Sequence, residues 1–218
     1  DNGMRLKETI ISYWRWLHRR DGYEEISTPV ALDESLWHTS GHANYYRENM
    51  YFMDIDERSF AVKPMNCPGG ILVYKDRRRS YRELPLRIAE LGLVHRHEMS
   101  GVLHGLFRVR SFTQDDAHIY CTEEQLEDEV IGVVNLVLEI YRTFGFEDVE
   151  VELSTRPEKR IGADAVWDQA ESTLEAALKR LDLDYKVNAG DGAFYGPKID
   201  FHIRDCMNRS WQCGTVQV

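Results

Sequence analysis

The run Arg108-Val-Arg-Ser-Phe-Thr-Gln-Asp-Asp-Ala-His-Ile-Tyr120 carries more information about the fold than any other part of this chain. A β-strand repeats every two residues, so an extended backbone directs alternate side chains to one face. The odd-numbered positions, such as Val109, Ala117 and Ile119, are mostly apolar, and we expect them to face a core. The even-numbered positions carry the chemically active side chains, namely Arg108, Arg110, Phe112, Gln114, Asp116 and His118.

Two interpretations of this alternation compete. A half-buried strand with one solvated face is the simpler one, because antiparallel sheets commonly expose one side to water. A solvated face, however, rarely combines two arginines, an aromatic ring, an amide, a carboxylate and an imidazole. We therefore interpret the even-numbered face as the floor of a binding cleft.

The composition limits the class of protein. The 218 residues suffice for one large domain with a substantial core. The hydrophobic content of 43% and the charged content of 29% are ordinary for a globular protein. A formal net charge of −10 excludes nucleic-acid binding through overall positive charge, so any contact with phosphate needs a local cluster of cations.

The cysteines and the hydropathy indicate the setting. Four cysteines are scattered without a Cys-x-x-Cys pair, which predicts a reduced, cytoplasmic setting rather than a disulfide framework. No apolar run approaches the length of a membrane span, so we expect no membrane association.

Hydrophobic periodicity predicts a mixed chain of helices and strands. We expect α-helices over residues 4–20, 71–74, 122–144 and 163–181. We expect β-strands over residues 23–30, 50–55, 59–62, 86–99, 108–120, 149–153, 198–204 and 211–218. The prediction is a single α+β domain, residues 1–218, built on an antiparallel β-sheet flanked by helices.

The common nucleotide and hydrolase motifs are absent, among them Gly-x-Gly-x-x-Gly, the P-loop, Gly-x-Ser-x-Gly and His-Glu-x-x-His. A nucleotide would therefore bind on a sheet. Arg96 can meet a phosphate with its planar set of donors, and Glu98 on the same face can accept from an exocyclic amine. Phe112 can stack on a purine. An antiparallel hairpin between residues 86–99 and 108–120 would bring these groups together.

The same hairpin resembles a known family. The segments Val94-His-Arg-His-Glu-Met-Ser-Gly101 and Leu103-His-Gly-Leu-Phe-Arg-Val-Arg-Ser-Phe-Thr-Gln-Asp-Asp-Ala-His118 are similar to motif 2 of the class II aminoacyl-tRNA synthetases. The opening helix and Ser27-Thr-Pro-Val30 resemble motif 1, which in that family forms much of the dimer interface. The resemblance implies the class II catalytic fold and a homodimer formed through the N-terminal helix and strand.

Three further blocks resemble the threonyl-tRNA synthetases within this class. They are Lys63-Pro-Met-Asn-Cys-Pro-Gly69, Asp191-Gly-Ala-Phe-Tyr-Gly-Pro-Lys-Ile-Asp200 and Trp211-Gln-Cys-Gly-Thr-Val-Gln217. The implied function is ATP-dependent activation of threonine to threonyl-adenylate, followed by transfer to the 3′ end of tRNA(Thr). Prolyl and seryl specificities fit less well, because those enzymes lack the combination of Cys-Pro-Gly with Asp-Asp-Ala-His.

The resemblance implies roles for residues at the nucleotide. Arg96 would hold the α-phosphate of ATP, Glu98 would contact the adenine amino group, and Mg²⁺ would bridge the phosphates. The remaining nucleotide contacts would come from Phe112 stacked on adenine, Arg108 at the outer phosphates, and Gln212 and Thr215.

The resemblance also implies roles around the amino acid. Tyr195, Gln114 and Asp116 would surround threonine, with Asp116 reading its hydroxyl group. Cys67 and His118 would be two of three protein ligands of a Zn²⁺ ion that binds the amino and hydroxyl groups. His42 corresponds to a position near the acceptor end of tRNA.

Ordinary structural roles are the alternative for the two proposed zinc ligands. Without the resemblance, Cys67 would be interpreted as a small buried thiol and His118 as a hydrogen-bonded strand histidine.

Gly70 departs from the family, which commonly has histidine there. Val218 precedes the third zinc ligand and motif 3, and no editing or anticodon-binding domain is found, so we expect an incomplete catalytic domain. The alternative function is an inactive, synthetase-like nucleotide-binding or regulatory module.

Overall fold

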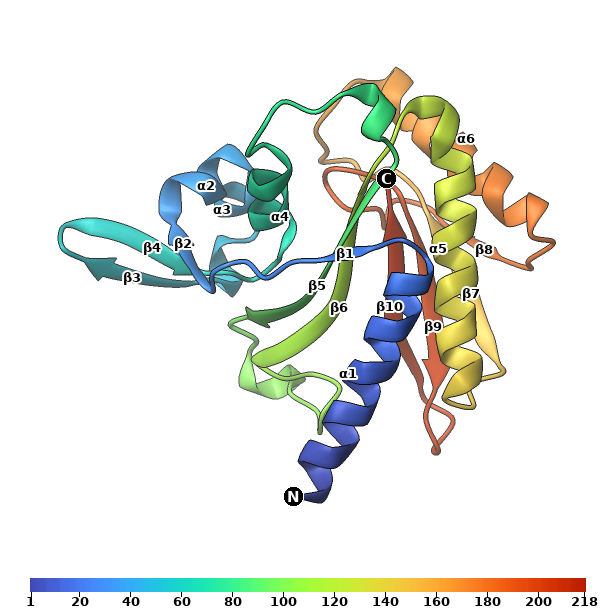
Figure 1. Cartoon of the computed structure of the whole chain (residues 1–218), viewed down its shortest axis with the longest axis horizontal. Helices are drawn as coiled ribbons and strands as arrows, with labels where there is room; N and C mark the ends of the chain where they lie inside the picture. The colour runs from blue at the N-terminus through green and yellow to red at the C-terminus, as the bar shows by residue number, and fades with distance from the viewer. The chain divides into compact units, whose positions relative to one another are not determined.

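A computed structural model describes residues 1–218, and the chain separates into two compact units, Asp1–Tyr120 and Cys121–Val218 (Figure 1). The first unit contains α1 (Asn2–Arg20), β1 (Glu24–Glu25), β2 (Ala31–Asp33), α2 (Glu34–Thr39), α3 (His42–Tyr45), β3 (Tyr51–Ile55), β4 (Arg58–Val62), α4 (Cys67–Tyr74), β5 (Leu86–His95) and β6 (Ser111–Tyr120). Its strands form two sheets, in the orders β1-β5-β6 and β2-β4-β3. None of the chain's helices has the length and apolar character that crossing a membrane requires.

The predicted long hairpin is present as β5 and β6, although β5 ends at His95 and does not continue to the predicted Met99. Their pairing is antiparallel and unbroken from Leu86 opposite Tyr120 to His95 opposite Ser111. The expectation that Arg108 and Arg110 continue the strand is wrong, because β6 begins at Ser111. The preceding backbone turns back on itself instead, through an isolated antiparallel bridge between His104 and Arg108.

The sequence predicted that the odd-numbered face of this hairpin faces a core, and the structure shows the opposite. Along β6 the odd-numbered positions from Ser111 to Ala117 are exposed, whereas the even-numbered positions are half-buried. Along β5 the even-numbered positions Ile88 and Val94 are 4% and 0% exposed. The segment that precedes α4 covers the even-numbered face, so the polar face lies underneath protein.

The strand predicted over residues 23–30 is shorter than expected. Only β1 pairs with β5, in parallel, and the Ile26 N–H donates to the Ala89 carbonyl at 2.8 Å. The next ladder positions are lost, because the Thr28 N–H donates to the Glu90 carboxylate at 2.7 Å and Pro29 has no N–H. A side chain of β5 thus replaces the backbone as the partner of this segment.

A buried ion pair joins three distant parts of the first unit. The Lys63 ammonium lies 2.9 Å from Glu90 Oε1 and donates to Thr28 Oγ1 at 2.8 Å. Lys63 and Glu90 are 1% and 5% exposed. Glu90 stands opposite Asp116 in the β5–β6 register, so the lysine also offsets the repulsion between two carboxylates on one face.

A smaller sheet and two short helices complete the first unit. The predicted hairpin is confirmed as β3 and β4, and Asp56 and Glu57 turn it with φ of 49° and 62°. Such positive φ values at both central residues match the right-handed twist of the flanking strands. A small core lies beside this sheet, formed by Trp37, Ala43, Met50 and Ala61.

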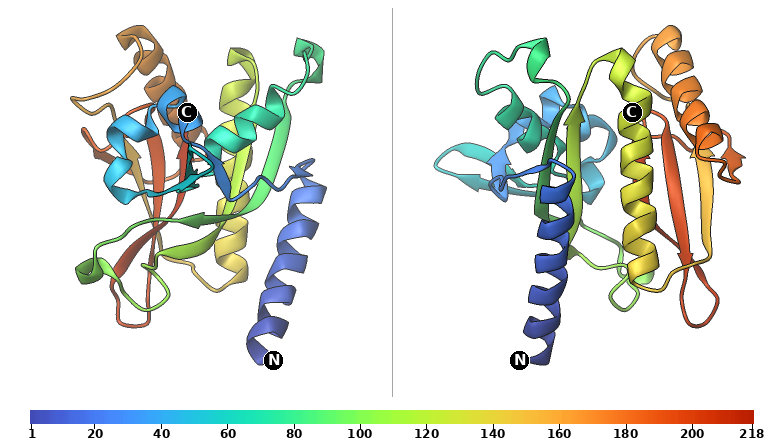
Figure 2. Two further views of the ribbon diagram at one scale, coloured as in Figure 1. Left: turned by 90° about the vertical axis from the view of Figure 1, so that its left-hand side faces the viewer. Right: turned by 45° about the vertical axis from the view of Figure 1, so that its right-hand side comes forward.

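The second unit is a four-stranded sheet with two long helices on one face (Figure 2). Its elements are α5 (Glu123–Thr143), β7 (Val149–Ser154), α6 (Asp164–Arg180), β8 (Lys186–Asn188), β9 (Lys198–Arg204) and β10 (Ser210–Gln217). The strand order is β10-β9-β7-β8, with only the β7–β8 pair parallel. The α+β prediction, with mainly antiparallel sheets flanked by helices, is confirmed.

Sequence patterns account for this unit closely. The predicted capping box is present, because Gln125 Oε1 accepts from the Thr122 N–H at 3.0 Å. The predicted alternation along β9 is also confirmed. Ile199 and Phe201 are 0% exposed and face the helices, while Asp200 points to the opposite side.

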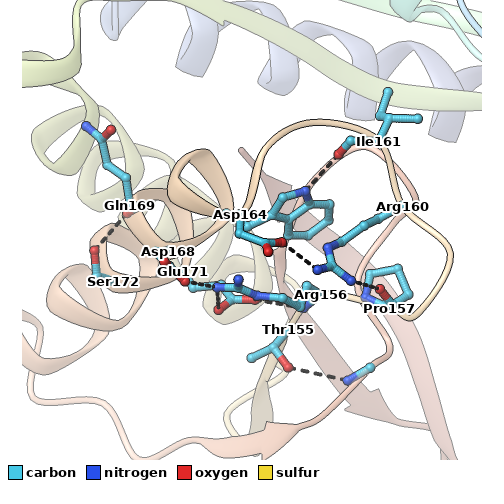
Figure 3. Close-up of polar contacts among 12 residues, drawn as sticks. Thr155, Arg156, Pro157, Arg160, Ile161, Asp164, Asp168, Gln169, Glu171 and Ser172 are labelled. Carbon is cyan, nitrogen blue, oxygen red and sulfur yellow. Dashed lines mark hydrogen bonds and ion pairs between the residues drawn. The ribbon is translucent and has the colours of Figure 1, made fainter.

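A polar network fastens the loop between β7 and α6 (Figure 3). The Arg156 guanidinium donates to Glu171 and Asp168 at 2.7 and 2.5 Å, and Arg160 donates to Asp164 at 2.6 Å. The arginine next to Glu171 lowers the pKa of that carboxyl group. These contacts hold the loop against the first half of α6. The sequence patterns predicted the helix but not these contacts.

We predict that Leu174→Ala lowers the free energy of unfolding by about 2–5 kcal/mol, because it leaves a cavity in the core of the second unit. Leu174 is 0% exposed, whereas Val166 on the same helix is 64% exposed. Urea denaturation of both variants, with Val166→Ala as the control, measures the difference. Equal losses at the two positions would contradict the packing described here.

We predict that Lys63→Met destabilises the protein by about 3–5 kcal/mol, because Glu90 would remain buried without a cation. Arg77→Met is the matched control, since Arg77 pairs with Glu83 at 2.7 Å on the surface. The control should leave the thermal unfolding midpoint nearly unchanged. A similar midpoint for both variants would show that the buried pair is not important for stability.

Candidate functional site

Arg96 and Phe112 lie together at the open end of the β5–β6 hairpin. The Arg96 guanidinium lies 5.2 Å from the centre of the Phe112 ring and 6.0 Å from that of Tyr46. Its Nε donates to the Pro64 carbonyl at 3.0 Å. The predicted phosphate-binding and purine-stacking side chains are therefore neighbours, and the segment before α4 holds the arginine in place.

Glu98 and Tyr46 adjoin this pair. Burial raises the pKa of the Tyr46 phenol, the Glu98 carboxylate adds to the rise, and Arg96 opposes it. The Glu98 carbonyl also accepts from Arg110 Nε at 3.0 Å, which ties the two arms of the hairpin together beyond the paired strands.

Arg108 lies outside the strand that was expected to carry it. It is exposed, and its guanidinium donates to the Phe107 carbonyl at 3.2 Å. The residue lies in the turn before β6.

Gln114 and Asp116 are brought together by a residue that was not predicted. Asn66 Nδ2 donates to Asp116 Oδ2 at 2.9 Å and to Gln114 Oε1 at 3.3 Å. Asp115 faces the other way, as expected, and its carboxylate accepts from Trp14 Nε1 at 2.5 Å. The even-numbered face of β6 thus presents a carboxylate and an amide in one cluster.

Cys67 and His118 both border the first turn of α4. Cys67 opens this helix, and a Cβ placed on Gly70, three residues later, would lie 3.4 Å from His118 Nδ1. Burial, with Asp116 adding, raises the pKa of the Cys67 thiol to about 12. The thiol is therefore protonated at neutral pH while no metal is bound.

A metal site of three side chains is not found. No group of three or more His, Cys, Asp and Glu side chains is arranged to hold a metal ion. Tyr120 completes the surroundings of Cys67, and its ring stacks on Tyr74 with centroids 3.9 Å apart. Burial, Cys67 and Tyr74 together raise the pKa of the Tyr120 phenol to about 12, and its buried hydroxyl has no hydrogen-bond partner.

In the second unit, a buried carboxylate organises two of the predicted residues. Asp200 is 1% exposed, and its Oδ1 accepts from Gln212 Nε2 at 2.6 Å and from Thr215 Oγ1 at 3.0 Å. Lys198 lies 2.9 Å from the other carboxylate oxygen, which also accepts from Ser154 Oγ at 2.9 Å. Asp200 therefore sets the direction of both Gln212 and Thr215.

A β-bulge explains how these two side chains reach one face. Gln212 and Thr215 are an odd number of residues apart, so a regular strand would direct them to opposite faces. The register of β10 against β9 shifts between Gln212 and Gly214, which inserts one unpaired residue. Both side chains consequently lie on the face of β9 that carries Asp200.

Tyr195 and His42 differ in their accessibility. Tyr195 is 36% exposed in the loop before β9, and its hydroxyl donates to Gln217 Oε1 at 2.6 Å. His42 is 4% exposed, with its Nδ1 2.9 Å from Ser40 Oγ and its Nε2 3.1 Å from Met65 Sδ. Burial lowers the pKa of His42.

Comparisons with known proteins identify the family of the chain. Residues 51–218 match the tRNA synthetase class II core domain (G, H, P, S and T). The chain is 60% identical, over 216 residues, to the threonine–tRNA ligases of Acetivibrio thermocellus and Carboxydothermus hydrogenoformans, covering 99% of this chain and 34% of each relative. It thus spans about a third of the length of these curated relatives.

A solved structure gives the same result. The crystal structure of the RNA binding domain of threonyl-tRNA synthetase from Cryptosporidium parvum Iowa II matches with a TM-score of 0.95 and 45% sequence identity. The match covers 99% of this chain and 54% of that chain. From the family match, the sequence identity and the shared fold, we conclude that this chain belongs to the class II tRNA synthetase core domains.

Proposed function

We propose that the protein carrying this chain is a threonine–tRNA ligase, which activates threonine with ATP and transfers it to tRNA(Thr). The observation that carries the proposal is the shared face of β5 and β6. At one end of that face Arg96 lies on Phe112, and further along it Gln114 and Asp116 are held by Asn66. The similarity to curated threonine–tRNA ligases supports the choice of amino acid.

At the nucleotide, the chain supplies position and charge. Amino-acid activation requires the carboxylate and the α-phosphate in line, and it requires cations where negative charge develops. Arg96 would hold the α-phosphate, Phe112 would stack on adenine, and Glu98 would accept from the adenine amino group. Arg108 would meet the outer phosphates, with Mg²⁺ bridging them. Gln212 and Thr215, both directed by Asp200, would complete the nucleotide contacts.

At the amino acid, Asp116 would accept a hydrogen bond from the threonine hydroxyl, while Gln114 and Tyr195 would line the site. Valine has no hydroxyl and would leave the Asp116 carboxylate without a partner, which excludes it strongly. Serine lacks only a methyl group, worth about 1–3 kcal/mol, so we expect serine to be activated at a detectable rate.

Cys67 and His118 fit a zinc ion by their chemistry. A thiolate sulfur and an imidazole nitrogen are preferred zinc ligands, and both side chains border the first turn of α4. Zinc with an open coordination position would bind the amino and hydroxyl groups of threonine. The high pKa of Cys67 means that binding of the ion must displace a proton from the thiol.

Exposed apolar side chains along α1 support a homodimer. Its large apolar side chains Met4, Leu6 and Trp16 are 57%, 63% and 56% exposed. Apolar groups in such a series on one helix favour burial against a partner. The proposed function includes a homodimer formed through α1 and a cytoplasmic location. It also includes the acceptor end of tRNA(Thr) as a binding partner.

We predict threonine-dependent exchange of pyrophosphate into ATP by the full-length natural protein, and we expect Arg96→Ala to slow it about 10²–10³-fold. Arg77→Ala, which changes a surface arginine, is the control and should retain the exchange rate. ATP binding without exchange for any amino acid would favour an inactive nucleotide-binding module. Exchange that depends on proline or serine but not on threonine would contradict the proposed specificity.

We predict that Cys67→Ser and His118→Ala each reduce the zinc content of the purified full-length protein, whereas Cys206→Ser does not. Cys206 is exposed and serves as the matched control. Because the Cys67 thiol must lose a proton, zinc affinity should rise with pH and fall in acid. Metal analysis and zinc titration at several pH values measure both effects, and an unchanged zinc content in Cys67→Ser would exclude this residue as a ligand.

A further inference from the structure

We propose that Asn66 is a positioning residue for amino-acid selection, acting through Asp116 and Gln114. The inference rests on the proposed function, because it assumes that Asp116 reads the threonine hydroxyl. It goes further by assigning the orientation of that carboxylate to one amide, and the space for the amide to Gly92. Four features of the structure carry the argument.

The first feature is a helix cap that is not used. Asn66 is the N-cap residue of α4, a position where asparagine normally accepts from a backbone N–H of the first turn. Here its backbone has φ −92° and ψ −20°, and its side chain makes no capping hydrogen bond. Capping therefore does not explain an asparagine at this position.

The second feature is the use of the amide on β6 instead. Asn66 Nδ2 donates to Asp116 Oδ2 at 2.9 Å and to Gln114 Oε1 at 3.3 Å, and the residue is 1% exposed. Its Oδ1 is buried without a hydrogen-bond partner. The reversed amide would set Oδ1 against the Asp116 carboxylate, acceptor against acceptor. Asp116 thus determines how the amide points, even though one acceptor is left unsatisfied.

The third feature is the space that Gly92 leaves opposite the Asn66 amide. A Cβ on Gly92 would lie 2.2 Å from Asn66 Nδ2 and 2.2 Å from Oδ1. Gly92 lies within β5 without a positive φ, so its backbone conformation does not require glycine. Gly92 stands opposite Gln114 in the register, directly under the amide. The missing side chain is therefore explained by the room that Asn66 needs.

The fourth feature is the charge on the partner. Asp116 stands opposite Glu90 in the β5–β6 register, and Lys63 already neutralises Glu90. A second cation at Asp116 would satisfy that carboxylate and compete with a substrate for it. A neutral amide instead holds one oxygen of Asp116 in place and leaves its negative charge available to the hydroxyl group of a substrate.

The test compares Asn66→Leu, which keeps the branching at Cγ but has no polar atoms, with Asn66→Ala in the full-length natural protein. Pyrophosphate exchange is measured with threonine, serine and valine, together with the KM for ATP. We expect kcat/KM for threonine and for serine to fall together by about 10- to 100-fold, the effect of losing one hydrogen bond to a charged group. Valine does not use Asp116, so its kcat/KM should change much less, and the KM for ATP should stay constant.

The matched control is Asn188→Leu. Asn188 Nδ2 also donates to a carboxylate, Glu152 Oε2 at 3.3 Å, but in the second unit. This variant should leave the ratio of threonine to valine activation unchanged. An unchanged threonine-to-valine ratio in both Asn66 variants, or an equal fall for all three amino acids, would overturn the inference. The proposed function would still stand in that case, provided that the wild-type protein shows threonine-dependent exchange. Absence of threonine-dependent exchange in the wild type would overturn both.

A double-mutant cycle tests the contact itself. Gly92→Ala alone should lower the threonine-to-valine ratio and the thermal unfolding midpoint, because the added Cβ displaces the Asn66 amide. In the Asn66→Ala background the same change should have little further effect on either quantity, since the space has been vacated. Equal costs of Gly92→Ala in both backgrounds would show that the two residues act independently, and the positioning role would be rejected.

Discussion

The antiparallel register of β5 against β6 is the constraint on which the candidate site depends. Because Glu90, Gly92 and Val94 stand opposite Asp116, Gln114 and Phe112, the side chains with a proposed role within the two paired strands share one face. A shift by one residue would move this whole set to the other side of the sheet. Ten paired residues in each strand, without a bulge, make such a shift costly.

The segment from Lys63 to Cys67 covers that face and adjusts its charge. Lys63 neutralises Glu90, Pro64 accepts from Arg96, Asn66 holds Asp116, and Cys67 opens α4. This one segment therefore contacts both the proposed nucleotide end and the proposed amino-acid end of the hairpin. The burial of this segment also explains why the even-numbered face is the covered one, although its side chains are polar.

The sequence predicted the four longer helices, the two hairpins and the face that carries Phe112, Gln114, Asp116 and His118, because these follow from periods of 2.0 and 3.6 residues. It missed the short helices α2 and α3 and the short strands β2 and β8. It overestimated the strand around Pro29, where a Glu90 side chain takes the place of a backbone partner. It also missed the bulge at Cys213 and the roles of Asn66 and Asp200. These depend on contacts between residues far apart in the chain, and local periodicity contains no information about them.

The most direct test of the account is a crystal structure of the full-length protein with threonine and a non-hydrolysable ATP analogue. The account predicts adenine on Phe112, the α-phosphate at Arg96, and the threonine hydroxyl at Asp116 while Asn66 Nδ2 remains bonded to that carboxylate. Ligands bound against the odd-numbered face, beside Asp115, would contradict the account. An Asn66 side chain turned away from Asp116 with both ligands in place would contradict it as well.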